Sequence, residues 1–209
     1  MTLATKNTQF GLTGQYYNAT NPTPGTGVVS LAAPTAFTDI KPYILFNNAD
    51  PVKNVTIDYL RLQCTVAGTN GTAIHWAHKI DGSNASRYTS GGSVITPVNA
   101  YQGAGSNSSA IIYCGAIVAV ASSASSRLLG HGNIRVVKPV IGDTYLFNFN
   151  GDMGAGVSGM ILDGSAIANV VTETSPVIIG PGQWWAFHLW LPAQSVGSSY
   201  EFDLGYIEA

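Results

Sequence analysis

The histidines are the first residues in this chain that could do chemistry. His75 and His78 are the closest pair, but they lie three residues apart in a predicted strand. Because strand side chains alternate between faces, the two point to opposite sides and make a poor pair for one metal ion. His131 lies between two glycines, which predicts an exposed loop residue. His188 lies among tryptophans, so we expect a packed core or interface histidine, or else a pH-sensitive contact between subunits.

The carboxylates and serines show no local catalytic signature. Many of the eleven Asp and Glu residues lie in predicted turns, where Asp commonly accepts turn hydrogen bonds. No pair is placed by local sequence as a glycosidase acid and base. The segment 156–159 lacks the Gly-x-Ser-x-Gly spacing of a nucleophile elbow, and no predicted helix follows the Gly-rich segment 151–156 to bind phosphate. We therefore expect no enzyme, no cofactor and no metal site. A glycan hydrolase whose carboxylates are brought together by folding is the remaining enzymatic hypothesis.

The elements around these residues are organised by a Trp-rich segment near the C-terminus, which holds three of the four tryptophans. Gly180-Pro181-Gly182 predicts a turn, and the strand after it alternates with a period of two. One face carries Trp185, Phe187, Leu189 and Leu191, and the other carries Trp184, Ala186, His188 and Trp190. Both faces are apolar, so both need cover. One side is the core, and the other is a second sheet, a neighbouring subunit or a ligand groove. We assign Trp184, His188 and Trp190 to an oligomer interface.

The rest of the chain also has the pattern of strands. Alternating or continuous apolar runs predict strands at 42–46, 54–66, 72–80, 93–96, 109–121, 133–137, 144–150 and 167–171. Asn70-Gly71 predicts a hairpin between two of them, and 82–108 is otherwise loop-like. The final strand places Phe202, Leu204 and Tyr206 on one side and Glu201 and Asp203 on the other. No helical periodicity is found. We predict an all-β, antiparallel, jelly-roll-like sandwich of about nine or ten strands over 37–209, preceded by an N-terminal arm or short strands over 1–36.

Composition limits the partners. Charged residues make up 10% of the 209 residues and the net charge is −2. Without a basic run the chain is a poor match for nucleic acid, and no apolar run has the roughly 20 residues of a membrane helix. No signal peptide is evident. Low surface charge suits a protein that packs against copies of itself. Cys64 and Cys114 are expected to be buried free thiols, with a disulfide in an oxidising compartment as the alternative.

Three features of the chain carry a resemblance to a known family. They are the uncharged strands rich in Gly, Ser, Thr, Asn and Ala, the turn and strand at 180–185, and the closing strand at 200–206. In these features, over most of its length, the chain resembles small jelly-roll virion proteins of tailed bacteriophages, of the capsid decoration, cement or head-fibre base type. The resemblance implies a homotrimer or another cyclic oligomer. It would be made in the host cytoplasm and would sit in the virion on the major capsid protein or another virion protein. No site residues can be carried over from it.

Three functional hypotheses follow beside the enzymatic one. The first is a non-enzymatic decoration protein that stabilises a capsid lattice by burying apolar surface, docking through the arm before Leu31. The second is a glycan- or host-receptor-binding module of a phage fibre or spike. It would use loops 82–108 and 151–159, or sugar-stacking tyrosines at positions 16, 17, 88, 101 and 113. The third is a single jelly-roll capsid protein, although the chain lacks the basic arm of the RNA-packaging kind.

Overall fold

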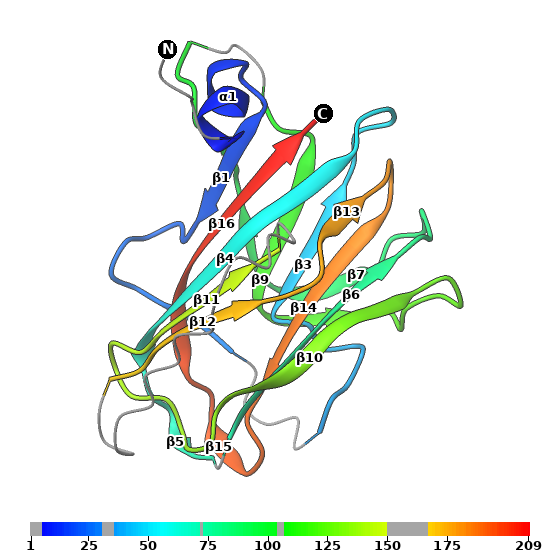
Figure 1. The fold of residues 1–209 in the computed structure, drawn as a ribbon. Helices are drawn as coiled ribbons and strands as arrows, with labels where there is room; N and C mark the ends of the chain where they lie inside the picture. The colour runs from blue at the N-terminus through cyan, green and yellow to red at the C-terminus, as the bar shows by residue number, and fades with distance from the viewer. Residues whose placement is uncertain (1–5, 31–35, 72, 104–106, 150–166) are drawn as a thin grey trace.

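Two packed β-sheets make up the protein in a computed structural model, which describes residues 6–30, 36–71, 73–103, 107–149 and 167–209 (Figure 1). Sheet A has the order β12 (Asn169–Glu173), β11 (Thr144–Asn148), β4 (Val55–Val66), β16 (Ser199–Glu208), β1 (Tyr16–Thr20) and β8 (Val98–Asn99). Two short strands join it, β13 (Val177–Ile179) beside β4 and β2 (Val28–Val29) beside β16. Sheet B has the order β10 (Arg127–Arg135), β6 (Ile74–Asp81), β14 (Trp184–Trp190), β3 (Ile44–Asn48), β9 (Ala110–Ala119) and β7 (Tyr88–Ile95).

The predicted antiparallel sandwich is confirmed, with one parallel pair between β11 and β12. A small ribbon of β5 (Thr69–Asn70) and β15 (Gln194–Val196) lies at one end of the sandwich, away from the C-terminal end of β16 (Figure 1). The described residues form sixteen strands rather than nine or ten. The additional strands are mostly two or three residues long. Such short strands leave no periodic signal, because they exist only through partners distant in sequence.

The N-terminal segment contributes to the sandwich. A helix, α1 (Lys6–Leu12), precedes β1 and was not expected from the sequence. All five residues of β1 pair with the final strand, from Tyr16 opposite Ile207 to Thr20 opposite Asp203. Among the described residues no helix is long and apolar enough to span a bilayer.

The predicted hairpin at Asn70-Gly71 is wrong. Both residues adopt positive φ, 59° and 104°, as the turn chemistry requires. However, β4 lies in sheet A and β6 in sheet B. The connection is therefore a crossover, and residues 69–70 pair with β15 instead. Other consecutive strands also lie in opposite sheets, such as β3 and β4 or β10 and β11, which gives the sandwich its jelly-roll-like path.

Segment 82–108 is also more ordered than a loop. It contains β8 and the eight-residue β7 in place of the short strand expected at 93–96. Gly91 and Gly92 have φ of 76° and 67°, and the register of β7 against β9 shifts beside them. These glycines permit an irregular strand whose sequence looks like a turn.

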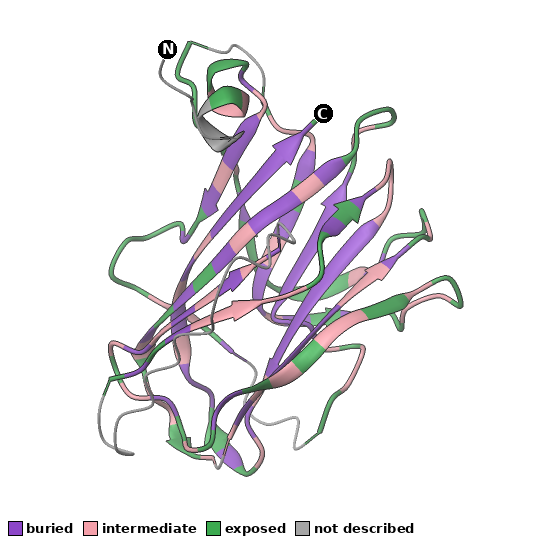
Figure 2. Ribbon diagram, viewed as in Figure 1, coloured by how far each residue is buried: buried purple, intermediate pink, exposed green. Residues whose placement is uncertain are grey.

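The core lies between the two sheets, whose central strands are largely buried (Figure 2). Its members follow the predicted alternation. Trp185, Phe187 and Leu189 of β14 face it from sheet B. Phe202, Leu204 and Tyr206 of β16 face it from sheet A. Cys64 and Cys114 are buried free thiols in opposite sheets, as predicted, and burial raises the pKa of Cys64 to about 12.

A buried carboxylate anchors one end of the core. Asp143 accepts hydrogen bonds from Arg135 Nη1 at 3.0 Å, Tyr145 Oη at 2.8 Å, and the backbone N–H groups of Val140 and Ala168, both at 2.7 Å. Both Asp143 and Arg135 are almost completely buried. The carboxylate therefore ties the end of β10 to the start of β11 and to the chain entering β12.

Candidate functional site

The sequence raised the question of what covers the second face of the Trp-rich strand, β14. That face belongs to the outer side of sheet B. Trp184 and Ala186 of β14 form a second apolar cluster there, with Leu45, Ile117 and Ala119 of the neighbouring strands. Trp184 is 5% exposed and Ala186 is fully buried. The prediction that both faces of the Trp-rich strand are covered is thus confirmed, and part of the cover is supplied by the chain itself.

The residues before β3 supply part of this cover. We name residues 37–41 the covering segment. Phe37 packs edge-on against His188, with ring centroids 4.9 Å apart, and against Trp190 at 5.7 Å. The backbone carbonyl of Ile40 accepts a 2.9 Å hydrogen bond from the N–H of Ala119. The segment is therefore held against both β14 and β9.

Asp39 fixes the covering segment electrostatically. It pairs with Lys79 Nζ at 2.8 Å and with Arg87 Nη2 at 3.5 Å, and its carboxylate accepts a hydrogen bond from the N–H of Ser122. Burial raises the pKa of Asp39, but the hydrogen bonds from Lys79 and Ser122 outweigh it and hold the pKa well below its ordinary value. Arg87 also lies 3.7 Å from Asp81, so one arginine joins the covering segment to the end of β6.

His188 lies beneath the covering segment and is 2% exposed. Burial lowers its pKa to about 3, and the positive charges of Arg87 and Lys79 act in the same direction against the opposing charge of Asp39. The ring is therefore neutral at physiological pH. A proton on it would be a buried charge next to Phe37 and two cations.

Trp190 remains partly accessible at the edge of this covered region. Its indole stacks on the ring of His75, with centroids 5.3 Å apart and planes inclined by 13°. A hollow of about 240 Å³ opens beside it, lined by Phe37, Ala77, Leu128, His131 and Trp190. Phe37 is 42% exposed and Leu128 is 52% exposed. We name this surface the Phe37–Trp190 hollow.

The three residues assigned to an oligomer interface thus differ in accessibility. Trp184 and His188 are buried within one chain, whereas Trp190 borders the Phe37–Trp190 hollow. Their role in an interface stays a prediction, in which Trp190 can touch a partner directly and the other two can only support it.

The other histidines are placed as follows. His75 and His78 lie on opposite faces of β6, as predicted: His75 stacks on Trp190 outside, and His78 is buried in the core. His78 Nε2 lies 2.7 Å from Thr174 Oγ1, and His78 Nδ1 accepts a 3.4 Å hydrogen bond from Trp185 Nε1.

His131 is exposed, but in β10 rather than in a loop. Within the described ranges no group of three or more His, Cys, Asp and Glu residues could hold a metal ion.

The tyrosines expected as sugar platforms are mostly occupied. Tyr16 and Tyr17 are buried. Tyr88 and Tyr113 stack on each other with centroids 3.8 Å apart, whereas Tyr101 is exposed. The second loop expected to bind a glycan, 151–159, lies outside the described residues.

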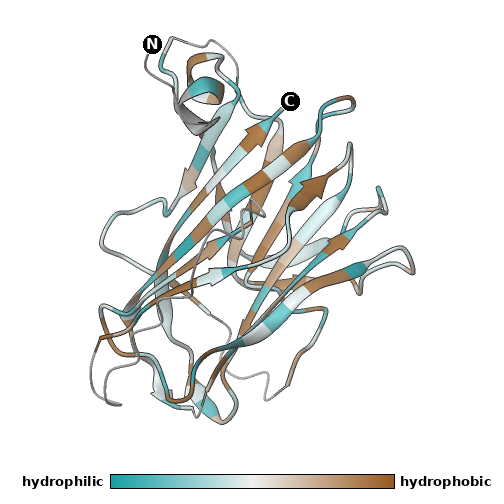
Figure 3. Cartoon of the chain, in the orientation of Figure 1, coloured by the Kyte–Doolittle hydropathy of each residue, from teal (hydrophilic) through white to brown (hydrophobic). Residues whose placement is uncertain are grey.

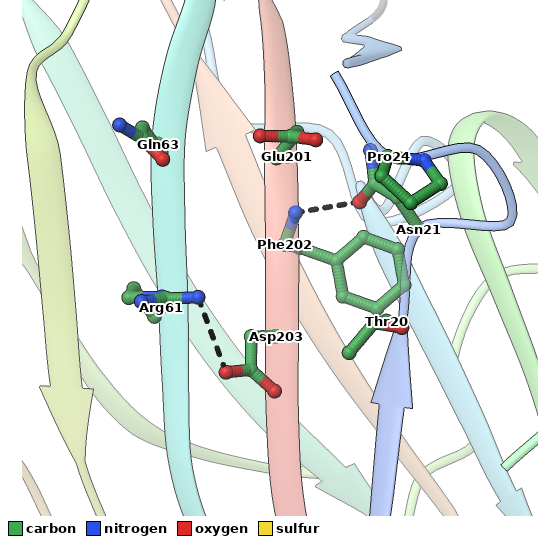
Figure 4. A pocket seen from close by; sticks show the side chains of 8 residues that line it. All are labelled: Thr20, Asn21, Pro24, Arg61, Gln63, Glu201, Phe202 and Asp203. Carbon is green, nitrogen blue, oxygen red and sulfur yellow. Dashed lines mark hydrogen bonds and ion pairs between the residues drawn. The ribbon is translucent and has the colours of Figure 1, made fainter. Parts of the chain in front are cut away.

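A polar hollow lies on the outer face of sheet A and was not predicted from the sequence (Figure 4). It measures about 130 Å³ and is lined by Thr20, Asn21, Pro24, Arg61, Gln63, Glu201, Phe202 and Asp203. The register of β4 against β16 places Arg61 opposite Asp203 and Gln63 opposite Glu201. Arg61 Nη2 lies 3.3 Å from Asp203 Oδ2. We name this surface the Arg61–Asp203 hollow.

The segment after β1 forms one rim of this hollow. Asn21 Oδ1 accepts a 2.6 Å hydrogen bond from the N–H of Phe202, and its amide donates to the carbonyl of Thr26 at 2.9 Å. The N–H of Gly25 donates to Glu201 Oε1. The rim is thus fastened to β16 by two hydrogen bonds that each join a backbone N–H group to a side-chain oxygen, and one oxygen of Glu201 is already used.

The alternation in the sequence predicts which residues of each strand could line this hollow. It predicts that Glu201 and Asp203 share a polar face, and along β4 polar and apolar residues also alternate (Figure 3). The missing information was that these two strands are neighbours.

Searches of protein-family models and of curated protein sequences found no match to the chain. Fold and surface together define a β-sandwich protein with an apolar hollow outside one sheet and a polar hollow outside the other.

Proposed function

We propose that this chain is a non-enzymatic structural protein of a virion, of the capsid decoration or cement type, that acts as a self-associating sandwich. The Phe37–Trp190 hollow is the observation that carries the proposal. Its lining is almost wholly apolar, and Phe37 and Leu128 beside it are half exposed. A concave apolar surface with protruding apolar neighbours is typical of a protein contact site.

Charge favours a second copy of the chain as the occupant. Only 10% of the residues are charged, so two copies can meet with little desolvation of ions. Lys79, whose Nζ lies 6.0 Å from the centroid of the Phe37 ring, already pairs with Asp39 at 2.8 Å. On the order of 1,000 Å² of apolar contact would contribute roughly 25 kcal/mol before the costs of association. Such burial is how a decoration protein would reinforce a capsid lattice.

Substitution of Leu128 tests the self-association. Leu128→Asp places a charge at the edge of the Phe37–Trp190 hollow without disturbing the core, since Leu128 is 52% exposed. We expect the oligomer to dissociate to a monomer in sedimentation or light scattering, because the charge would be buried in the contact. The matched control is Ile178→Asp in sheet A, where Ile178 is 58% exposed. A wild-type monomer, or equal effects of the two variants, would contradict the proposal.

Electron microscopy of the purified protein separates the two virion alternatives. A decoration protein forms small closed oligomers, of which a homotrimer is our expectation, and it adds to preformed capsids. A single jelly-roll capsid protein assembles into shells by itself. Shells made from this chain alone would replace the decoration hypothesis with the capsid-protein hypothesis.

A further inference from the structure

The Arg61–Asp203 hollow is not needed for the proposed self-association, since it lies on the outer face of the opposite sheet. Four polar side chains lie there in two rows, with Arg61 opposite Asp203 and Gln63 opposite Glu201. Figure 4 shows these four side chains on neighbouring strands, with Thr20 and Asn21 on the opposite side of β16 from β4.

Several hydrogen-bonding groups in this hollow are available. The Arg61 side chain is 55% exposed, and its pairing with Asp203 occupies one of its nitrogens. Within the described residues the Gln63 amide makes no hydrogen bond, and it can both donate and accept. The hollow therefore offers guanidinium and amide donors close to carboxylate and amide acceptors.

An aromatic ring lies next to these groups. Tyr59 precedes Arg61 on the same face of β4 and stands opposite Gly205 of β16. A Cβ atom at Gly205 would collide with Tyr59 Cε1 and with the hydroxyl of Tyr16. The absence of a side chain at Gly205 thus lets the Tyr59 ring extend across β16. Burial is the largest cause that raises the pKa of the Tyr59 phenol, and the negative charge of Asp203 and a hydrogen bond to it act in the same direction, so the hydroxyl stays protonated.

From this arrangement we propose that the Arg61–Asp203 hollow and the adjoining Tyr59 ring bind a neutral saccharide. Neighbouring hydroxyls of a sugar each need a donor and an acceptor, which the Arg61–Asp203 pair and the Gln63 amide supply. The apolar C–H face of a sugar ring packs on an aromatic ring such as Tyr59. Tyr59, Arg61 and Gln63 follow one another on one face of β4, so a ligand spanning them would lie along the strand.

The charges in the hollow disfavour anionic ligands. Arg61 is neutralised by Asp203, and Glu201 adds a second carboxylate. An anionic sugar, a phosphate or a sulfate would therefore meet net negative charge. An uncharged, hydroxyl-rich ligand avoids this repulsion and matches the mixture of donors and acceptors in the lining.

The test is a titration of the intact protein, followed by NMR or calorimetry, with defined trisaccharides built from glucose, galactose, mannose or N-acetylglucosamine. Sialylated and sulfated trisaccharides serve as anionic comparators. We expect at least one neutral trisaccharide to bind. Arg61→Met and Gln63→Ala should each weaken it by about tenfold, since each removes a hydrogen-bonding group. Arg127→Met, a change at an exposed arginine of β10 in sheet B, should leave the affinity unchanged.

Three results would overturn the inference: no binding of any neutral trisaccharide, a preference for the anionic ones, or equal affinity in the wild type, Arg61→Met and Gln63→Ala. If Arg61→Met does not fold, Gln63→Ala decides the question, because in the described structure that side chain makes no hydrogen bond that folding could require. Leu128→Asp should bind the trisaccharide like the wild type, so failure of self-association and failure of saccharide binding are distinguishable.

Discussion

Acid should destabilise this protein well before its carboxylates are protonated, because two neutral histidines are buried. Burial lowers the pKa of His78 to about 4 and that of His188 to about 3. The ordinary histidine pKa is about 6.5. Between that value and the depressed values the unfolded chain binds two protons that the folded chain does not. The free energy of unfolding therefore keeps its full histidine contribution above about pH 6.5, and it falls as the pH decreases toward 4 and 3.

The expected loss can be worked out from these pKa values. Each histidine costs about 1.4 kcal/mol per pH unit below about 6.5. At pH 5, which is about 1.5 units lower, each costs about 2 kcal/mol and the pair about 4 kcal/mol, a large share of the roughly 5–15 kcal/mol of a typical domain. Asp39, whose pKa is depressed, contributes stability that is lost only at still lower pH. Glu208, whose pKa burial raises, acts in the opposite direction near its own titration.

Urea denaturation at pH 7.5, 6.5, 5.5 and 5.0 measures this loss. His188→Leu removes one titrating group, so we expect its free energy of unfolding to fall with about half the wild-type slope. His131→Gln, a change at an exposed histidine, is the matched control and should keep the full slope. A wild-type stability that does not change between pH 6.5 and 5, or an unchanged slope in His188→Leu, would show that His188 is protonated in the folded protein.

Two further predictions concern the sandwich itself. Asp143→Ala removes the carboxylate partner of buried Arg135 and the acceptor of three other donors. It should cost about 3–5 kcal/mol in urea denaturation, and a loss below about 1 kcal/mol would contradict the anchoring role. Gly205→Ala forces the Tyr59 ring to move and should cost about 1–3 kcal/mol. Tyr59→Ala should relieve the part of that cost that is due to Tyr59, while the collision with the Tyr16 hydroxyl remains, and purely additive losses in the double variant would count against the collision with Tyr59.

The sequence predicts those features that depend on a local period. The two faces of β14 and of β16 are as expected, because alternation is a property of each strand alone. The conformation of Asn70-Gly71 was also local and is confirmed, but the hairpin was not, because a turn does not determine which sheet the next strand joins. The covering segment could not be predicted either, since Asp39 is held by Lys79, Arg87 and Ser122, from three separate parts of the chain.

The same limit explains why the Arg61–Asp203 hollow was missed although its polar residues were placed on the correct faces. Its existence depends on the register between β4 and β16, two strands far apart in the sequence. The two-sheet architecture also fixes the relation between the two proposed contacts. The hollow faces outward from sheet A, while the Phe37–Trp190 hollow faces outward from sheet B. A copy docked on sheet B therefore leaves sheet A open to a saccharide, so each contact should form with the same affinity whether or not the other is occupied.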